Sequence, residues 1–213
     1  MIKKLDITPE ALGDGKVFGI GLQRTGTTTL TAAMRLLGYR STHFPADLWD
    51  DPHAPLLDEY DALFDNPIPL IYKDLDARFP GSKFILTTRD EEGWLKSCEW
   101  LFTEMREPWG FDTSERLKAM HTYAYGTNHF NEDAFRQAFR DHHADVHAHF
   151  ADRPDDLLVL DIAEEDKWTP LCAFLGEPRP RAPFPHQNPS GRLERWTRDA
   201  RKALGRAYRR FTP

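Results

Sequence analysis

The sequence lacks most of the features that mark secreted, membrane and nucleic-acid-binding proteins. It has only two cysteines, Cys98 and Cys172, in 213 residues, too few for a disulfide framework and typical of a reducing compartment. No window approaches the roughly 20 apolar residues of a membrane span, and residues 1–15 contain no apolar signal-peptide core. The formal net charge is −6, whereas sequence-independent nucleic-acid binding needs a basic surface. We therefore expect a cytoplasmic protein that neither binds nucleic acid nor inserts into a membrane.

Apolar runs alternate with helical patterns along the chain. Strands are expected at 17–22, 39–44, 60–64, 83–89 and 157–162, and helices at 30–37, 68–79, 91–103 and 168–175. This alternation predicts an α/β fold with three layers, in which helices flank a central parallel β-sheet. We expect one domain over 1–213, with an N-terminal extension at 1–15, a mainly helical insertion at 104–150 and a C-terminal helix at 190–213.

A turn rich in glycine and threonine joins the first expected strand to the helix after it. It reads Gly21-Leu22-Gln23-Arg24-Thr25-Gly26-Thr27-Thr28-Thr29. A strand, a tight turn and a helix in this order direct backbone N–H groups and the helix dipole at one point, which favours an anion such as phosphate. The turn resembles a nucleotide-binding P-loop, G-x-x-x-x-G-K-S/T. Here Thr27 stands in place of the lysine and Arg24 precedes the second glycine, so an ordinary ATPase loop is not indicated.

A second motif lies on strand 83–89, which ends in Arg89 and is followed eight residues later by Ser97. Because ligands bind at the carboxyl ends of parallel strands, Arg24, Asp65 and Arg89 should lie at one edge. Together the two motifs resemble the sulfotransferases that use 3′-phosphoadenosine-5′-phosphosulfate (PAPS). The segments 65–67, 73–75, 79–89 and 184–188 also resemble small stand-alone microbial sulfotransferases, so the resemblance spans 16–188.

The resemblance implies a P-loop NTPase-like fold, a PAPS donor, adenosine 3′,5′-bisphosphate as product, and no metal requirement. The first loop is expected to bind the 5′-phosphosulfate through Gln23, Arg24, Thr25, Gly26, Thr27, Thr28 and Thr29. Arg89 and Ser97 are expected to bind the 3′-phosphate. The Arg-Lys-Gly loop with which many relatives complete that site is missing, and Arg179, Arg181 or Arg192 could replace it. The acceptor would be a hydroxyl, or less readily an amine, of a small molecule or glycan.

Sulfuryl transfer needs no protein nucleophile, since it depends on in-line positioning and on charge neutralisation at the leaving oxygen. We assign that neutralisation to Arg24. The general base is either Asp65, at the end of a strand, or His43, at the end of another, and Lys73 and Asp74 are weaker candidates.

Two other functions compete with this interpretation. A P-loop kinase using Mg-ATP would need a lysine after Gly26, and a non-catalytic relative would keep only nucleotide binding. Four histidines at 142, 143, 147 and 149 suggest a metal site, but the H-E-x-x-H pattern is absent. We expect them on a solvated helix face, and no feature of the sequence indicates an oligomeric state.

Overall fold

The computed structural model describes residues 15–103 and 114–186. The predicted C-terminal helix, Arg192 and nearly all of the N-terminal extension lie outside these ranges. Five parallel strands form one sheet in the order β2-β3-β1-β4-β5. The strands are β1 (Val17–Gly19), β2 (Ser41–His43), β3 (Ala62–Phe64), β4 (Lys83–Thr88) and β5 (Leu157–Asp161).

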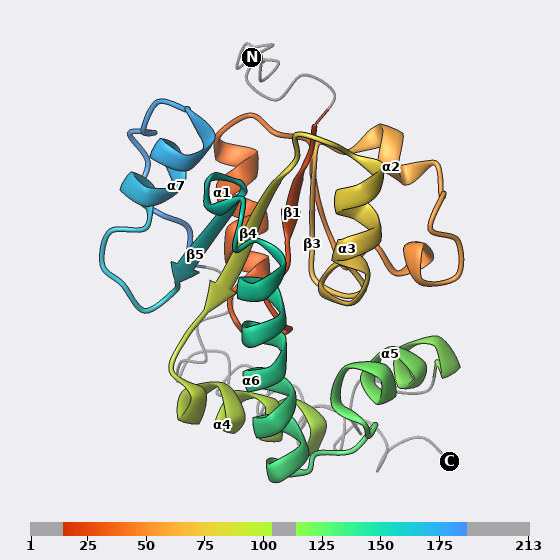
Figure 1. The fold of residues 1–213 in the computed structure, drawn as a ribbon. Helices are drawn as coiled ribbons and strands as arrows, with labels where there is room; N and C mark the ends of the chain where they lie inside the picture. Colours follow the sequence, from red (N-terminus) through yellow and green to blue (C-terminus); the bar gives the residue numbers. More distant parts are fainter. Residues whose placement is uncertain (1–14, 104–113, 187–213) are drawn as a thin grey trace, which may run out of the picture.

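The helices cover both faces of the sheet and extend beyond one end of it (Figure 1). They are α1 (Thr27–Leu36), α2 (Leu56–Glu59), α3 (Ile68–Arg78), α4 (Glu91–Thr103), α5 (Glu115–Tyr125), α6 (Glu132–His149) and α7 (Trp168–Leu175). Two short 3₁₀ turns, η1 (Ala46–Trp49) and η2 (Pro154–Asp156), complete the described elements. None of the described helices is both long and apolar enough to cross a membrane.

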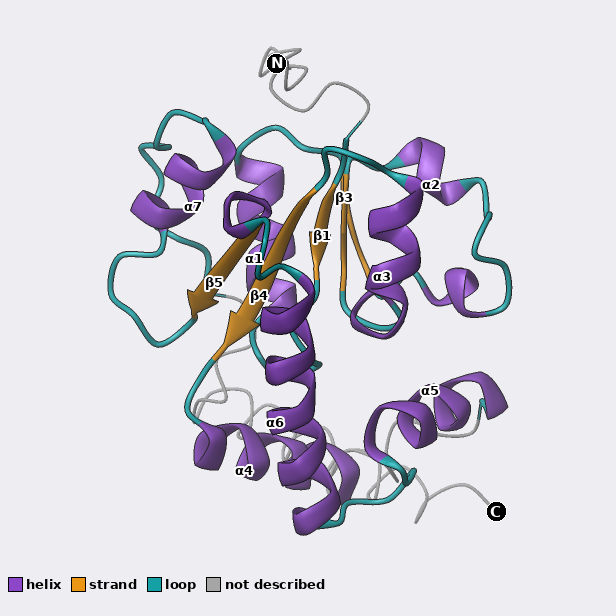
Figure 2. Ribbon diagram, in the orientation of Figure 1, coloured by secondary structure: helices purple, strands orange, loops and turns teal. Residues whose placement is uncertain are grey.

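Alternating side chains divide the core between the two faces of the sheet. Val17 packs with α1 and α7, whereas its neighbour Phe18 packs with α2, α3 and the end of α6. The same alternation holds on β4, where Phe84 and Ile85 belong to different clusters, as the two-residue period of a strand requires. Figure 2 shows the strands as one layer between helices. The predicted three-layer α/β fold is confirmed.

A third apolar cluster joins α4, α5 and α6 beyond the carboxyl ends of the strands. It is centred on Trp94, which is fully buried and packs against Phe135 and Phe139. In Figure 1 the arrowheads of β4 and β5 point towards this helical part. The helical insertion predicted at 104–150 therefore supplies α5 and α6, and residues 104–113 lie outside the described ranges.

Several predicted boundaries were wrong: β1 ends at Gly19 and not at residue 22, and β3 begins at Ala62 and not at residue 60. Two further differences have local reasons. Helix α1 begins at Thr27 rather than Leu30. Its first turn contains three threonines, and because threonine has low helix propensity the sequence pattern placed the start of the helix too late. Strand β2 covers only Ser41–His43. Tyr39 donates its backbone N–H to Met34 and so still belongs to the end of α1, while Phe44 leaves the extended conformation with φ 58°.

Candidate functional site

A cavity of about 690 Å³ lies at the carboxyl edge of the sheet. The structure brings together ten of the eleven predicted site residues around it, namely Gln23, Arg24, Gly26, Thr27, Thr28, Thr29, His43, Asp65, Arg89 and Ser97. The remaining one, Thr25, is buried beneath the loop. Its hydroxyl donates to the carbonyl of Leu22 at 2.6 Å and contacts the hydroxyl of Thr87 at 2.7 Å. Thr25 therefore anchors the loop to the sheet instead of lining the cavity.

The loop at the start of α1 depends on two glycines. Gly26 precedes the helix with φ 95°, a left-handed conformation that glycine adopts without strain. A Cβ on Gly26 would lie 2.7 Å from Ile162 Cγ2, and one on Gly21 would lie 2.4 Å from the carbonyl oxygen of Thr87. Neither position has room for a side chain. With glycine at both, the backbone of the loop can lie close to β4 and to the residue after β5.

The first turn of α1 presents an anion-binding end to the cavity. No side chain caps this helix, and Thr27, Thr28 and Thr29 all line the cavity. The first N–H groups of a helix have no acceptor within it and carry the positive end of the helix dipole. Such an end binds phosphate readily.

Two arginines reach the same cavity in different ways. Arg24 donates its Nε–H to Ser97 Oγ at 2.9 Å, and its guanidinium lies 5.4 Å from the centre of the Trp100 ring. The Nε of Arg89 is buried and has no hydrogen-bond partner within the described part of the chain. Ser97 therefore contacts Arg24, although the sequence had paired it with Arg89. A buried guanidinium nitrogen without an acceptor suits an anionic ligand.

His43 and Asp65, predicted as alternative bases, lie in contact. The Nε2 of His43 is 3.2 Å from Asp65 Oδ2 and 3.1 Å from the hydroxyl oxygens of Thr27 and Thr28. The Asp65 side chain is 14% exposed. Burial raises the pKa of its carboxyl group, while the charges of His43 and Arg24 oppose this shift. A carboxylate with a raised pKa accepts a proton more readily than a carboxylate with an ordinary pKa.

Backbone strain is concentrated at this cavity. Within the described ranges, the non-glycine residues with positive φ are Arg24 (71°), Phe44 (58°) and Asp65 (71°), and all three line the cavity. Such conformations cost on the order of 1–3 kcal/mol each and occur preferentially at functional sites. Arg24 and Asp65 were predicted from the sequence as site residues, and Phe44 was not.

The cavity also has lining residues that were not predicted as site residues. Phe44, Asp90, Leu101, Leu117, Ile162, Ala163, Lys167, Pro185 and His186 complete it. Ile162 directly follows β5, so the rule that sites form at strand ends could have identified it. Leu101 and Leu117 come from α4 and α5, whose positions depend on tertiary packing.

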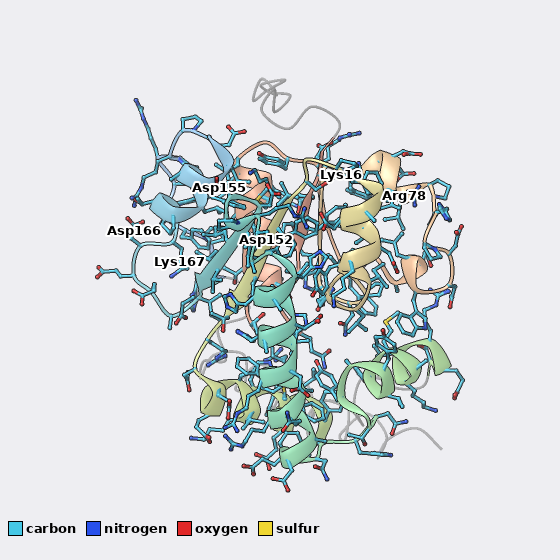
Figure 3. All side chains as sticks on the ribbon, in the orientation of Figure 1. Lys16, Arg78, Asp152, Asp155, Asp166 and Lys167 are labelled. Atoms are coloured by element: carbon cyan, nitrogen blue, oxygen red, sulfur yellow. The ribbon has the colours of Figure 1, made fainter. Side chains whose placement is uncertain are left out.

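Lys167 is a basic residue that lines the cavity, whereas neither Arg179 nor Arg181 lines it. Arg179 pairs with Asp166 at 3.0 Å and Thr169 at 2.9 Å, and Arg181 is exposed. Figure 3 labels Asp166 and Lys167 on the loop between β5 and α7. The ammonium group of Lys167 donates to the carbonyl of Glu164 at 2.5 Å.

Other predicted residues lie away from the cavity. Lys73 forms an exposed pair with Asp145 at 2.6 Å, and with Asp74 it lines a separate groove between α3, α5 and α6. The expectation that the four histidines face solvent was wrong for His142, whose Nε2 contacts the carbonyl of Ile20 at 2.6 Å. It was also wrong for the half-buried His143 and for His149, whose Nε2 lies 2.7 Å from Asp76 Oδ2. No group of three or more His, Cys, Asp or Glu residues in the described ranges could hold a metal.

Comparison with known proteins agrees with this geometry. A model of the sulfotransferase domain matches residues 16–57 and 47–193. Ava biosynthesis cluster protein M of Aspergillus versicolor is 28% identical to this chain, and the match covers 80% of this chain and 80% of that protein. Since the domain model matches well over half of its length, the chain belongs to the sulfotransferase family.

Proposed function

We propose that this protein transfers a sulfuryl group from PAPS to a hydroxyl, or less readily an amine, of an acceptor. One observation carries the proposal: the uncapped end of α1, Arg24 and Arg89 meet the contacting pair His43 and Asp65 in one cavity. The first three groups suit a polyanionic donor, and the pair suits removal of a proton. No residue of the cavity has to act as a nucleophile.

The donor's phosphates suit two features of the cavity, namely the uncapped start of α1 and the buried Nε of Arg89. We assign the 5′-phosphosulfate to the loop at Gly26 and to the first turn of α1, which offers backbone N–H groups. We assign the 3′-phosphate to Arg89, whose buried Nε has no acceptor within the described protein. Lys167 adds positive charge to the same cavity, and we propose it in the role first considered for Arg179.

Bound PAPS would supply the sulfuryl group, with a new bond from acceptor oxygen to sulfur and loss of the bond from sulfur to the leaving phosphate oxygen. Arg24 would neutralise negative charge at that leaving oxygen, and its bond to Ser97 fixes the guanidinium beforehand. The proton of the acceptor would pass to the pair formed by His43 and Asp65. Since these two groups are in contact, we assign proton removal to the pair and not to one of them alone.

The kinase alternative has little support. Thr27 occupies the position of the phosphate-binding lysine, and the family match is to a sulfotransferase domain. A cytoplasmic location is part of the proposal and rests on the two cysteines, which are both buried and free.

Donor binding can be tested by thermal unfolding with adenosine 3′,5′-bisphosphate or with ATP and Mg²⁺, each with and without EDTA. At about 100 times its Kd a ligand stabilises by roughly 2.7 kcal/mol, equivalent to a rise of a few degrees in Tm. We expect the bisphosphate alone to raise Tm, and EDTA to have no effect. A rise only with ATP and Mg²⁺ would contradict the proposal.

Catalysis is tested separately by incubating the protein with PAPS and a panel of phenols, alcohols, sugars and amines, with detection of sulfated products by mass. Asp65→Asn should keep the Tm rise with the bisphosphate and lose transfer by about 10²–10⁴-fold. Bisphosphate binding without transfer to any acceptor would identify a non-catalytic relative.

A further inference from the structure

Phe44 has an unusual backbone conformation that is fixed from both sides. It follows the last residue of β2, and its N–H still donates to the carbonyl of Phe64 at 2.9 Å. Its own carbonyl accepts from Ala46 at 2.8 Å. Between these two bonds Phe44 adopts φ 58°, which is a genuine outlier for a bulky residue.

In this conformation Phe44 lines the candidate site. Consecutive residues of a strand point to opposite faces, so an extended chain would direct His43 and Phe44 apart. Instead both line the cavity. Core packing does not explain this position, because Phe44 is 40% exposed. Since burial does not offset the strain, the strained backbone at the cavity is the feature to be explained.

Apolar residues from two helices face the same cavity. Leu101 on α4 and Leu117 on α5 line it together with Phe44. Leu101 lies one helical turn after Ser97, so one face of α4 carries both the hydroxyl that holds Arg24 and an apolar neighbour. The groups suited to phosphate belong to the loop 23–29, Arg89 and Ser97. The cavity therefore combines a donor end with apolar surface near the catalytic pair.

We propose that the acceptor presents its hydroxyl from an apolar, preferably aromatic, body, and that Phe44 holds this body beside His43 and Asp65 and so determines acceptor specificity. The inference rests on the proposed function and restricts the class of acceptor that the protein would use. A sugar would place several hydroxyl groups against Phe44, Leu101 and Leu117, where they lose hydrogen bonds to water without replacement. An alkyl or aryl group would gain from the same contact.

The test compares Phe44→Ala and Phe44→Gly with the wild type. Acceptors are 4-alkylphenols of increasing chain length, glucose and N-acetylglucosamine, each assayed with PAPS. Tyr123→Ala is the matched control, because Tyr123 is an exposed aromatic residue that lines the other groove. Each variant is characterised by kcat and KM for the acceptor, by Kd for adenosine 3′,5′-bisphosphate and by Tm.

We expect transfer to the alkylphenols and not to the sugars. Phe44→Ala should raise KM for an alkylphenol by about tenfold or more, which corresponds to about 1.4 kcal/mol of lost contact, and should leave the Kd of the bisphosphate unchanged. Phe44→Gly should show the same rise in KM with an equal or higher Tm, since glycine adopts positive φ without strain. Tyr123→Ala should match the wild type.

The failures of this inference and of the proposed function can be told apart. Bisphosphate binding without transfer to any alkylphenol, or with transfer to the sugars, would overturn the acceptor assignment and leave donor binding in place. The inference also fails if Phe44→Ala weakens bisphosphate binding and lowers Tm together, since Phe44 would then be structural. No bisphosphate binding by the wild type would reject the proposed function itself.

Discussion

Replacing Arg24 by alanine should lower kcat by about 10²–10³-fold and leave the fold intact. The guanidinium lines the cavity and is only partly exposed. Two unit charges about 4 Å apart interact by roughly 4 kcal/mol at an effective dielectric constant near 20. Because the leaving oxygen carries only part of a charge in the transition state, we expect about 3–4 kcal/mol, at about 1.4 kcal/mol per tenfold in rate. Alanine keeps the same strained φ at this position, so the stability should change little.

The contact between Arg24 and Ser97 allows a sharper version of this experiment. Ser97 either orients Arg24, as the 2.9 Å bond indicates, or binds the 3′-phosphate independently. In the first case Ser97→Ala should lower kcat in the wild type and have little further effect in Arg24→Ala, because the two residues act as one unit. In the second case Ser97→Ala should raise the Kd of adenosine 3′,5′-bisphosphate equally in both backgrounds.

The assay follows release of the bisphosphate by chromatography under saturating PAPS and acceptor, with circular dichroism to check the fold. Arg24→Lys serves as the matched control, since it keeps the charge but cannot reproduce the planar fork of arginine, and its kcat should lie between the other two. A kcat of Arg24→Ala within about tenfold of the wild-type value would refute the assignment of Arg24 to the leaving oxygen.

Two further predictions concern the loop and the pH dependence of stability. Gly26→Ala should lower Tm more than Gly81→Ala and should weaken bisphosphate binding, because both glycines have positive φ but only the Cβ at Gly26 would meet a neighbour within 4 Å; equal effects of the two changes on Tm and on binding would contradict this account. Burial lowers the pKa of His143 from 6.5 to about 4, so the folded protein binds this proton less readily than the unfolded chain, and stability should fall as the pH drops from 6.5 towards 4. His143→Gln should therefore lose less Tm than the wild type between about pH 7 and pH 4.5, and an equal loss would show that His143 does not carry this dependence.

Much of the fold could be predicted because its signals are local. Alternating apolar runs and helices indicated the parallel sheet, and the placement of Gly21 and Gly26 indicated the loop before α1. The rule that sites form at strand ends then brought Arg24, His43, Asp65 and Arg89 to one edge, as the structure does.

The remaining features of the site depend on conformation and on tertiary position. Nothing in the sequence around Phe44 indicates a positive φ, because phenylalanine normally favours an extended strand. Lys167 was not among the predicted cations, whereas Arg179, which was, pairs with Asp166 instead of lining the cavity. Ser97 was found by its spacing from Arg89, but its partner is Arg24.

The order of strands in the sheet has a consequence for how the protein is made. β1, the central strand, emerges first during synthesis, and its neighbours β3 and β4 both lie within the first 88 residues. β5 pairs with β4 only after α4, α5 and α6 have been synthesised, which makes this pairing the most distant in sequence and the slowest to form. Until it forms, Ile162 cannot pack against Gly26, and Lys167 cannot join the cavity. In the nascent chain, the part that holds the glycine loop, Asp65 and Arg89 should therefore fold early. The donor site should be completed by Ile162 and Lys167 only in the final folding step.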